Sequence, residues 1–142
     1  MKALQFYPAS PSTAADYDFG KPCTSVNYRD MVSLCSGNED FKGSYDQSMM
    51  TNRAVLPLNQ SVIVYDTPQT IKRKMCTITK AYPELHLGIA LYDIDFEDTE
   101  KICTNKKHLN DTSGYWRLEP SSAYMKTVLT NVSFHTDNKP CP

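Results

Sequence analysis

Long apolar runs, paired-cysteine motifs and nucleophile motifs are all missing from this chain of 142 residues. No apolar stretch approaches the roughly 18 residues that a membrane span needs, so a membrane protein is not expected. No Cys-x-x-Cys pair occurs, which argues against a zinc site and against thioredoxin-like redox chemistry. No Gly-x-Ser-x-Gly occurs either, and the 3 histidines lie in separate segments, so no serine-hydrolase triad can be recognised.

The charges of the chain nearly cancel, with 15 Lys and Arg residues against 16 Asp and Glu residues. The net charge of -1 leaves no basic footprint for a nucleic acid, so none is expected as a partner. Hydrophobic residues make up 40% of the sequence, which is typical of a globular protein rather than a disordered one. The length predicts a single domain over residues 1–142, and no cofactor is expected.

The cysteines are scattered along the chain. There are 5 of them: Cys23, Cys35, Cys76, Cys103 and Cys141. Scattered cysteines suit disulfides made in an oxidising compartment, and buried free thiols are the alternative. The odd number means that one thiol stays free or pairs with another chain. No apolar leader follows Met1, so we expect either a mature secreted form whose signal has been removed or a cytoplasmic protein.

Three Asn-x-Ser/Thr triplets favour the secreted form, since N-glycosylation occurs on exported proteins. The acceptor residues of these triplets are Asn59, Asn110 and Asn131. Together with the cysteines, they predict a secreted, extracellular protein that has no membrane partner.

Turn residues and periodicity place the elements of the first half. Residues 3–7 are a strand candidate, residues 10–23 are rich in Pro, Ser and Gly and are expected to be loop, and residues 27–35 fit a short helix. Three further strand candidates are joined by short polar links, which predicts an antiparallel meander. These candidates are residues 44–50, 53–58 and 61–65.

The second half predicts a strand–helix–strand unit. Thr67 followed by Pro68 is a good helix start, and Pro83 ends the helix. Residues 85–96 are apolar enough to form a buried strand, so a parallel βαβ crossover is expected. A last helix opens at Pro120. The apolar stripe of the first helix is formed by Ile71, Met75, Ile78 and Tyr82.

Two segments of this unit resemble a known family. Residues 65–74 resemble the Tyr-Asp-Asp…Ser-Ile…Lys segment of the family-18 glycoside hydrolases, the chitinases and chitinase-like lectins. Residues 87–98 resemble their eighth barrel strand, with Tyr92 at the usual tryptophan position and Cys103 at the cysteine that follows. Upstream, residues 28–35 resemble the Tyr-Tyr-Glu-x-Cys element of the family's insertion domain.

The resemblance implies an α/β fold, a partial (β/α) barrel remnant of the last strands and helices joined to a small antiparallel α+β insertion subdomain. Residues 24–66 would be the insertion-like part, residues 67–134 the barrel-like part and residues 135–142 a tail. Two barrel strands alone leave open sheet edges, so we expect loops, a rearrangement, an oligomer or a partner chain to cover them.

The family's pattern also implies a disulfide between Cys35 and Cys103. For Cys23, a pairing with Cys76 and a pairing with Cys141 are both left open.

An acidic stretch brings catalysis into consideration. Residues 93–97 resemble the last half of the family's catalytic Asp-x-x-Asp-x-Asp-x-Glu strand, in which Glu97 would be the general acid. The eighth-strand alignment also accounts for Cys103 and for residues 65–66, so it is preferred, and no catalytic residue is predicted. Two other interpretations of these carboxylates are a solvated strand end and a Ca²⁺ site, although the glycine-containing EF-hand spacing is absent.

Because the preferred alignment leaves the family's catalytic strand unmatched, the resemblance predicts a secreted, non-catalytic protein. Such a protein would bind an extracellular or host protein, as immunomodulators in tick saliva do. One alternative is a glycan-binding chitinase-like lectin, and a second is a glycoside hydrolase fragment that uses Glu97. In the lectin, sugars would stack on three aromatic side chains: Tyr92, Tyr115 and Trp116. No metal site is predicted.

Overall fold

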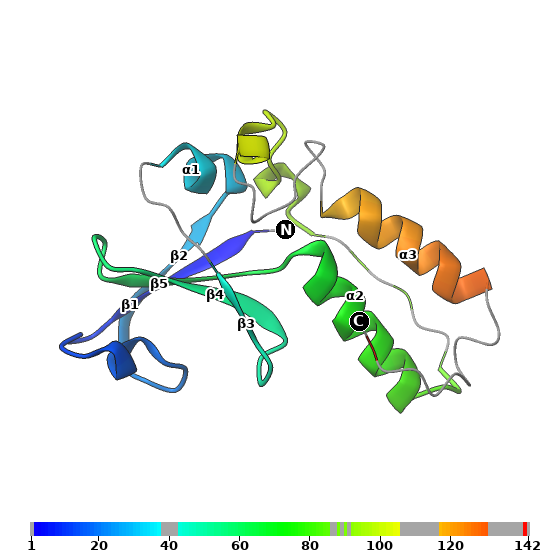
Figure 1. The fold of residues 1–142 in the computed structure, drawn as a ribbon, viewed down its shortest axis with the longest axis horizontal. Helices are drawn as coiled ribbons and strands as arrows, with labels where there is room; N and C mark the ends of the chain where they lie inside the picture. The colour runs from blue at the N-terminus through cyan, green and yellow to red at the C-terminus, as the bar shows by residue number, and fades with distance from the viewer. Residues whose placement is uncertain are drawn as a thin grey trace.

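A five-stranded antiparallel sheet and two long helices are the main elements of the computed structural model (Figure 1). It describes residues 2–37, 43–85, 88, 90, 92–105, 117–130 and 141. The strand order is β2-β1-β5-β4-β3. The strands are β1 (Ala3–Pro8), β2 (Cys23–Arg29), β3 (Ser44–Asp46), β4 (Thr51–Leu56) and β5 (Ser61–Tyr65). The helices are α1 (Met31–Ser36), α2 (Pro68–Ala81) and α3 (Leu118–Thr130), with 3-10 turns η1 (Ala14–Tyr17), η2 (Ile94–Phe96) and η3 (Ile102–Asn105).

The predicted strands of the first half form, with shifted limits, and β5 lies between β1 and β4. The strand expected over residues 44–50 ends at Asp46 because residues 47–50 form a turn, and the strand expected over residues 53–58 runs from Thr51 to Leu56. The edge strand β2 was missed, because its seven residues are polar or exposed and show no burial pattern. Part of the expected helix over residues 27–35 is therefore strand. The helix itself begins only at Met31, where the Asp30 side chain accepts a hydrogen bond of 2.6 Å from Ser33 N.

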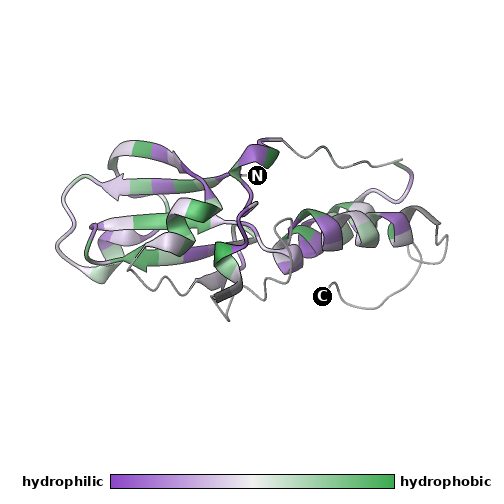
Figure 2. Ribbon diagram, turned by 90° about the horizontal axis from the view of Figure 1, so that it is seen from above, coloured by the Kyte–Doolittle hydropathy of each residue, from purple (hydrophilic) through white to green (hydrophobic). Residues whose placement is uncertain are grey.

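Helix α2 begins where the sequence predicts. The Thr67 hydroxyl accepts from the backbone N–H of Thr70, and the Thr70 hydroxyl accepts from the backbone N–H of Thr67. The expected apolar stripe is only partly buried, however, since Ile71 is buried whereas Ile78 and Tyr82 are exposed. The reason is the position of the helix: α2 lies beside α3, beyond the end of the sheet rather than across it (Figures 1 and 2).

The strand predicted over residues 85–96 does not form at the residues described there. Leu85, Gly88 and Tyr92 are exposed, and Asp93 adopts a left-handed conformation with φ of 55° before the turn η2. Apolar composition alone suggested a buried strand, but no neighbouring strand supplies hydrogen bonds to the described part of this segment. All the strand pairs between described residues are antiparallel, so the expected parallel crossover is not seen among them.

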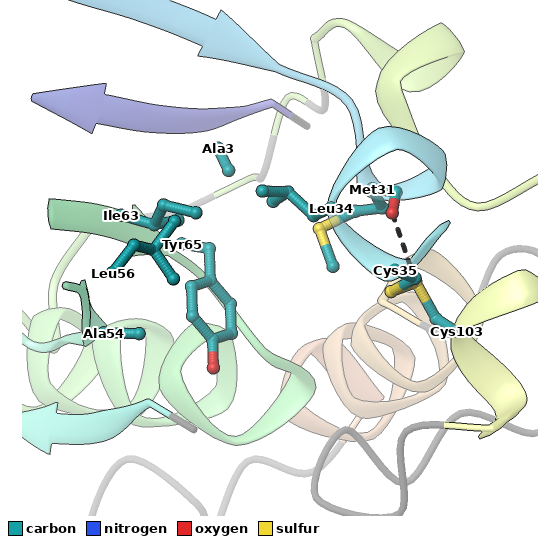
Figure 3. Close-up of a cluster of buried hydrophobic side chains, with 9 residues drawn as sticks. All are labelled: Ala3, Met31, Leu34, Cys35, Ala54, Leu56, Ile63, Tyr65 and Cys103. Atoms are coloured by element: carbon teal, nitrogen blue, oxygen red, sulfur yellow. Dashed lines mark hydrogen bonds between the residues drawn. A yellow bond between two sulfur atoms is a disulfide. The ribbon is translucent and has the colours of Figure 1, made fainter. Parts of the chain in front are cut away.

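The core lies on one face of the sheet, where α1 and η3 pack against the strands (Figure 3). The disulfide between Cys35 of α1 and Cys103 of η3 lies within it, as the resemblance implied. The Cys103 sulfur also lies 3.5 Å from the carbonyl oxygen of Met31. The cluster consists of buried side chains from three strands, α1 and η3: Ala3, Met31, Leu34, Cys35, Ala54, Leu56, Ile63, Tyr65 and Cys103.

A second disulfide joins Cys76 of α2 to Cys141. Both pairings left open for Cys23 are therefore wrong, and Cys23 is a free, exposed thiol at the start of β2. This agrees with the odd number of cysteines. The predicted tail is described only at residue 141.

Replacing both Cys35 and Cys103 with alanine should lower the free energy of unfolding by about 2–5 kcal/mol, because the bridge constrains the unfolded chain. The matched control is Cys76→Ala/Cys141→Ala, since the two bridges span 68 and 65 positions and have almost the same loop-closure entropy. The first pair also lies in the core, so its loss should be the larger of the two in urea unfolding of the oxidised proteins. Equal losses would contradict a packing role for that bridge.

Candidate functional site

The second face of the sheet carries the most distinctive surface of the molecule. Phe6 lies opposite Val26 on one side and opposite Val62 on the other, so these three side chains project from the same face. The same pairings bring neighbouring residues of β1, β2, β4 and β5 to this face. We call the set the open face: Leu4, Phe6, Val26, Tyr28, Val55, Val62 and Val64.

The open face is only partly covered. The exposed fractions are 44% for Val26, 60% for Tyr28 and 37% for Val55. Among the described helices, α1 packs on the opposite face, and α2 and α3 lie beyond the end of the sheet. The strands accordingly keep hydrophobic segments that no described helix covers (Figure 2). Apolar surface that stays in contact with water in this way favours association with another molecule.

One end of the open face is covered by the loop that carries η1. Arg53 of β4 donates a hydrogen bond of 2.6 Å to the Asp18 carboxylate, and its guanidinium lies 5.8 Å from the centre of the Phe19 ring. The loop is also held internally, because the backbone N–H groups of Ser12 and Thr13 donate to Asp16. These bonds lower the pKa of Asp16 to about 2.

A pocket of about 160 Å³ lies between this loop and the strands. Cavities of roughly this size hold a benzene ring, so it has room for a single apolar side chain. The free thiol of Cys23 is at its wall. The apolar part of the lining comes from the open face and from the loop: Phe6, Pro8, Tyr17, Phe19, Pro22 and Val62.

The other end of the open face carries a cation. The Lys2 ammonium lies 3.6 Å from the centre of the Tyr28 ring and 3.1 Å from a carboxylate oxygen of Asp93. The contact orients the exposed Tyr28 ring and gives it a favourable cation–π interaction.

The acidic residues 97 and 98 have a structural role. Glu97 is fully buried with Arg117, whose Nε and Nη2 lie 3.0 and 2.9 Å from the two carboxylate oxygens. Asp98 is also buried and accepts hydrogen bonds from the backbone N–H groups of Ile102 and Cys103, at 2.9 and 2.5 Å. The interpretation as a solvated strand end is therefore wrong for Glu97 and Asp98, although Asp95 is exposed.

This geometry gives no support to Glu97 as a general acid. A general acid must reach its substrate, whereas the side chain of Glu97 is inaccessible and both its oxygens contact the Arg117 guanidinium. As for a Ca²⁺ site, the described ranges contain no group of three or more His, Cys, Asp or Glu side chains that could hold a metal ion.

The residues predicted for glycan binding are not brought together in the described part of the chain. Tyr92 is 76% exposed and belongs to the segment after α2, not to the open face. Tyr115 and Trp116 lie outside the described residues. Among the glycosylation acceptors, Asn59 is exposed in the turn between β4 and β5, and Asn110 and Asn131 lie outside the described residues.

The open face was missed because β2 was missed. The alternation of Leu4 with Phe6 and of Val62 with Val64 was visible in the sequence, but it did not show which of these residues stay uncovered. The pocket forms where the loop that carries η1 lies against the strands, and this loop is joined to β4 by Arg53 and Asp18, which are 35 positions apart.

No protein-family model matches the sequence, and no curated protein matches it either. The likeness to the family-18 glycoside hydrolases therefore rests on the motifs quoted above. Within the described ranges, no helix combines the length and the apolar character needed to cross a bilayer.

Glu97→Gln should lower the free energy of unfolding by about 3–5 kcal/mol, because it leaves the buried Arg117 guanidinium without its counter-charge. The double variant Glu97→Leu/Arg117→Met removes both charges and should lose less than the sum of the single variants Glu97→Leu and Arg117→Met. Urea unfolding of the parent, these two single variants and the double variant gives the coupling. Asp95→Asn, at the exposed neighbour, is the control and should stay within about 0.5 kcal/mol of the parent. Additive losses would show that the two buried groups do not depend on each other.

Proposed function

We propose that this chain is a secreted, non-catalytic chitinase-like protein that acts by binding an extracellular protein. The observation that carries the proposal is the open face, with its partly exposed Val26, Tyr28 and Val55 and the adjoining pocket. Apolar and aromatic side chains beside a recess are typical of the anchoring positions of protein–protein interfaces.

Secretion is supported by the two disulfides, since such bonds persist in oxidising compartments. The exposed position of Asn59 leaves its glycosylation acceptor accessible. The partner we propose is accordingly an extracellular protein, and a host protein if the chain acts as a salivary immunomodulator.

The chitinase-like part of the proposal takes the chain as the remnant of a (β/α) barrel that lacks the catalytic strand. It is supported by the motif segments and by the Cys35–Cys103 bridge that they imply. The non-catalytic part is supported by the burial of Glu97, the acidic side chain closest to the family's acid in sequence pattern. A partly covered sheet face also fits a chain that has lost neighbouring barrel strands.

The test is retention of a partner from host plasma and leukocyte lysate on the immobilised, oxidised, glycosylated protein. Val26→Lys should reduce retention of a dominant partner by about 10-fold or more, because a charge is brought into an apolar contact. The matched control is Ile78→Lys on α2, since Val26 and Ile78 are equally exposed at 44%. Ile78→Lys should leave retention unchanged. If no protein is retained, or if both variants bind as the parent does, the open face is not the interface.

The glycan-binding alternative keeps one specific observation in its favour, the 76% exposure of Tyr92. A lectin of this kind should change its Trp116 fluorescence when titrated with chito-oligosaccharides. Tyr92→Ala should weaken the response by about 10-fold, since stacking of a ring on an aromatic side chain is worth about 1 kcal/mol or more. Unchanged fluorescence at millimolar oligosaccharide would remove this alternative.

A further inference from the structure

We propose that the outer edge of β2 binds an extended segment of the partner protein as a sixth strand. The segment carries apolar residues at alternate positions and an acidic residue near each end. The inference rests on the proposed function and names the chemistry of the partner. It is argued from the sheet order, from the side chains that β2 presents and from two cations that flank the strand.

Among the described residues, β2 has a neighbouring strand on one side only. β2 is the first strand of the sheet, with β1 as its neighbour, and its residues from Cys23 to Tyr28 are all exposed. It is seven residues long, about 23 Å at the rise of a strand, whereas the opposite edge strand β3 has three residues. The backbone N–H and C=O groups of an edge strand that point away from the sheet can form hydrogen bonds with another extended backbone.

The side chains of β2 specify an alternating partner. Val26 and Tyr28 are two positions apart on the open face, so a strand added beside β2 places every second side chain next to them. Burying Val26 and Tyr28 favours apolar residues at those positions. The pocket lies at the Cys23 end of the strand, where it offers space for a third apolar side chain of the same segment.

Two cations select the ends of the segment. Lys21 is exposed just before β2, and Arg29 is its last residue; within the described part of the chain, neither makes an ion pair with a carboxylate. The Nε atom of Arg29 is buried and has no hydrogen-bond partner among the described residues. Of the nearby acids, Asp18 is held by Arg53. Asp30 interacts electrostatically with Arg29, but its carboxylate accepts hydrogen bonds from Ser33 at the start of α1.

Acidic residues near the two ends of the partner strand complement these cations. A second copy of this chain is disfavoured as the occupant. Antiparallel pairing of two β2 edges would bring Lys21 of one copy toward Arg29 of the other, and the like charges would repel each other. We therefore commit to a foreign acidic strand.

The test begins with a random peptide library displayed on phage and selected against the oxidised, glycosylated protein. Enriched peptides should alternate apolar residues and should carry Asp or Glu near both ends. The best of them is then synthesised with N-methyl groups on every second backbone amide, in each of the two possible phases. One phase should weaken binding by about 10-fold or more, since several strand hydrogen bonds are lost, and the other phase should leave it nearly unchanged.

A charge-reversal variant tests whether Lys21 selects an acidic residue in the bound segment. Selection against Lys21→Glu should replace the acidic residue at one end of the enriched peptides with Lys or Arg. Lys126→Glu, at an exposed position of α3, is the matched control and should return the same peptides as the parent. This test reads a change in which peptides are enriched, not a loss of binding. A variant that fails to fold cannot produce such a change.

Three results would overturn the inference: no enriched peptide, equal effects of the two methylation phases, or a stable dimer in sedimentation that excludes the peptide. The proposed function fails separately. A partner whose retention depends on Val26 but is not displaced by the selected peptide keeps the open face as the interface and removes strand addition. If a peptide shows the phase effect but no plasma or leukocyte protein is retained, strand addition stands and the proposed function fails.

Discussion

The fold depends on covering one face of a small sheet. Helix α1 is only six residues long and η3 only four, so neither would be stable alone. The Cys35–Cys103 bridge fixes them to each other, and their buried side chains belong to one cluster with those of β1, β4 and β5. The Asp98 carboxylate adds a second fixing point, because it binds the first backbone N–H groups of η3. A cross-link, a cap and a few apolar side chains thus do together what a longer helix does in a larger domain.

The buried pair of Glu97 and Arg117 extends this arrangement toward the helices. Glu97 adjoins Asp98, and Arg117 immediately precedes α3, so the ion pair connects the segment beside the core to the helical end of the molecule. Two adjacent acids that resemble part of a catalytic strand are therefore used for internal contacts. The surface left for function is the opposite one, where Val26, Tyr28 and the pocket face solvent.

Elements that are set by neighbouring residues could be predicted from the sequence, whereas elements that depend on distant contacts could not. The existence of β1, the antiparallel meander and the Thr67 cap of α2 depend on neighbouring residues, and all three were predicted, although the strand limits shifted. β2 could not be, because an exposed edge strand needs no apolar alternation. The strand expected at residues 85–96 was wrong at the described positions because an apolar run does not reveal whether a partner strand exists. Of the candidate site, the alternation of β1 and β5 was visible. The position of the loop beside the pocket was not, because its contact with β4 joins Asp18 to Arg53, which are far apart in the sequence.

The order of the bridged cysteines has one more consequence. The sequence positions of the two bridges interleave as 35, 76, 103 and 141, so the covalent loops overlap between residues 76 and 103. A protease that cuts the backbone once anywhere from residue 36 to residue 140 leaves both pieces joined by at least one bridge. In a fluid rich in proteases, such a nick would not shed a fragment, and the strands of the open face would stay tethered to the helices.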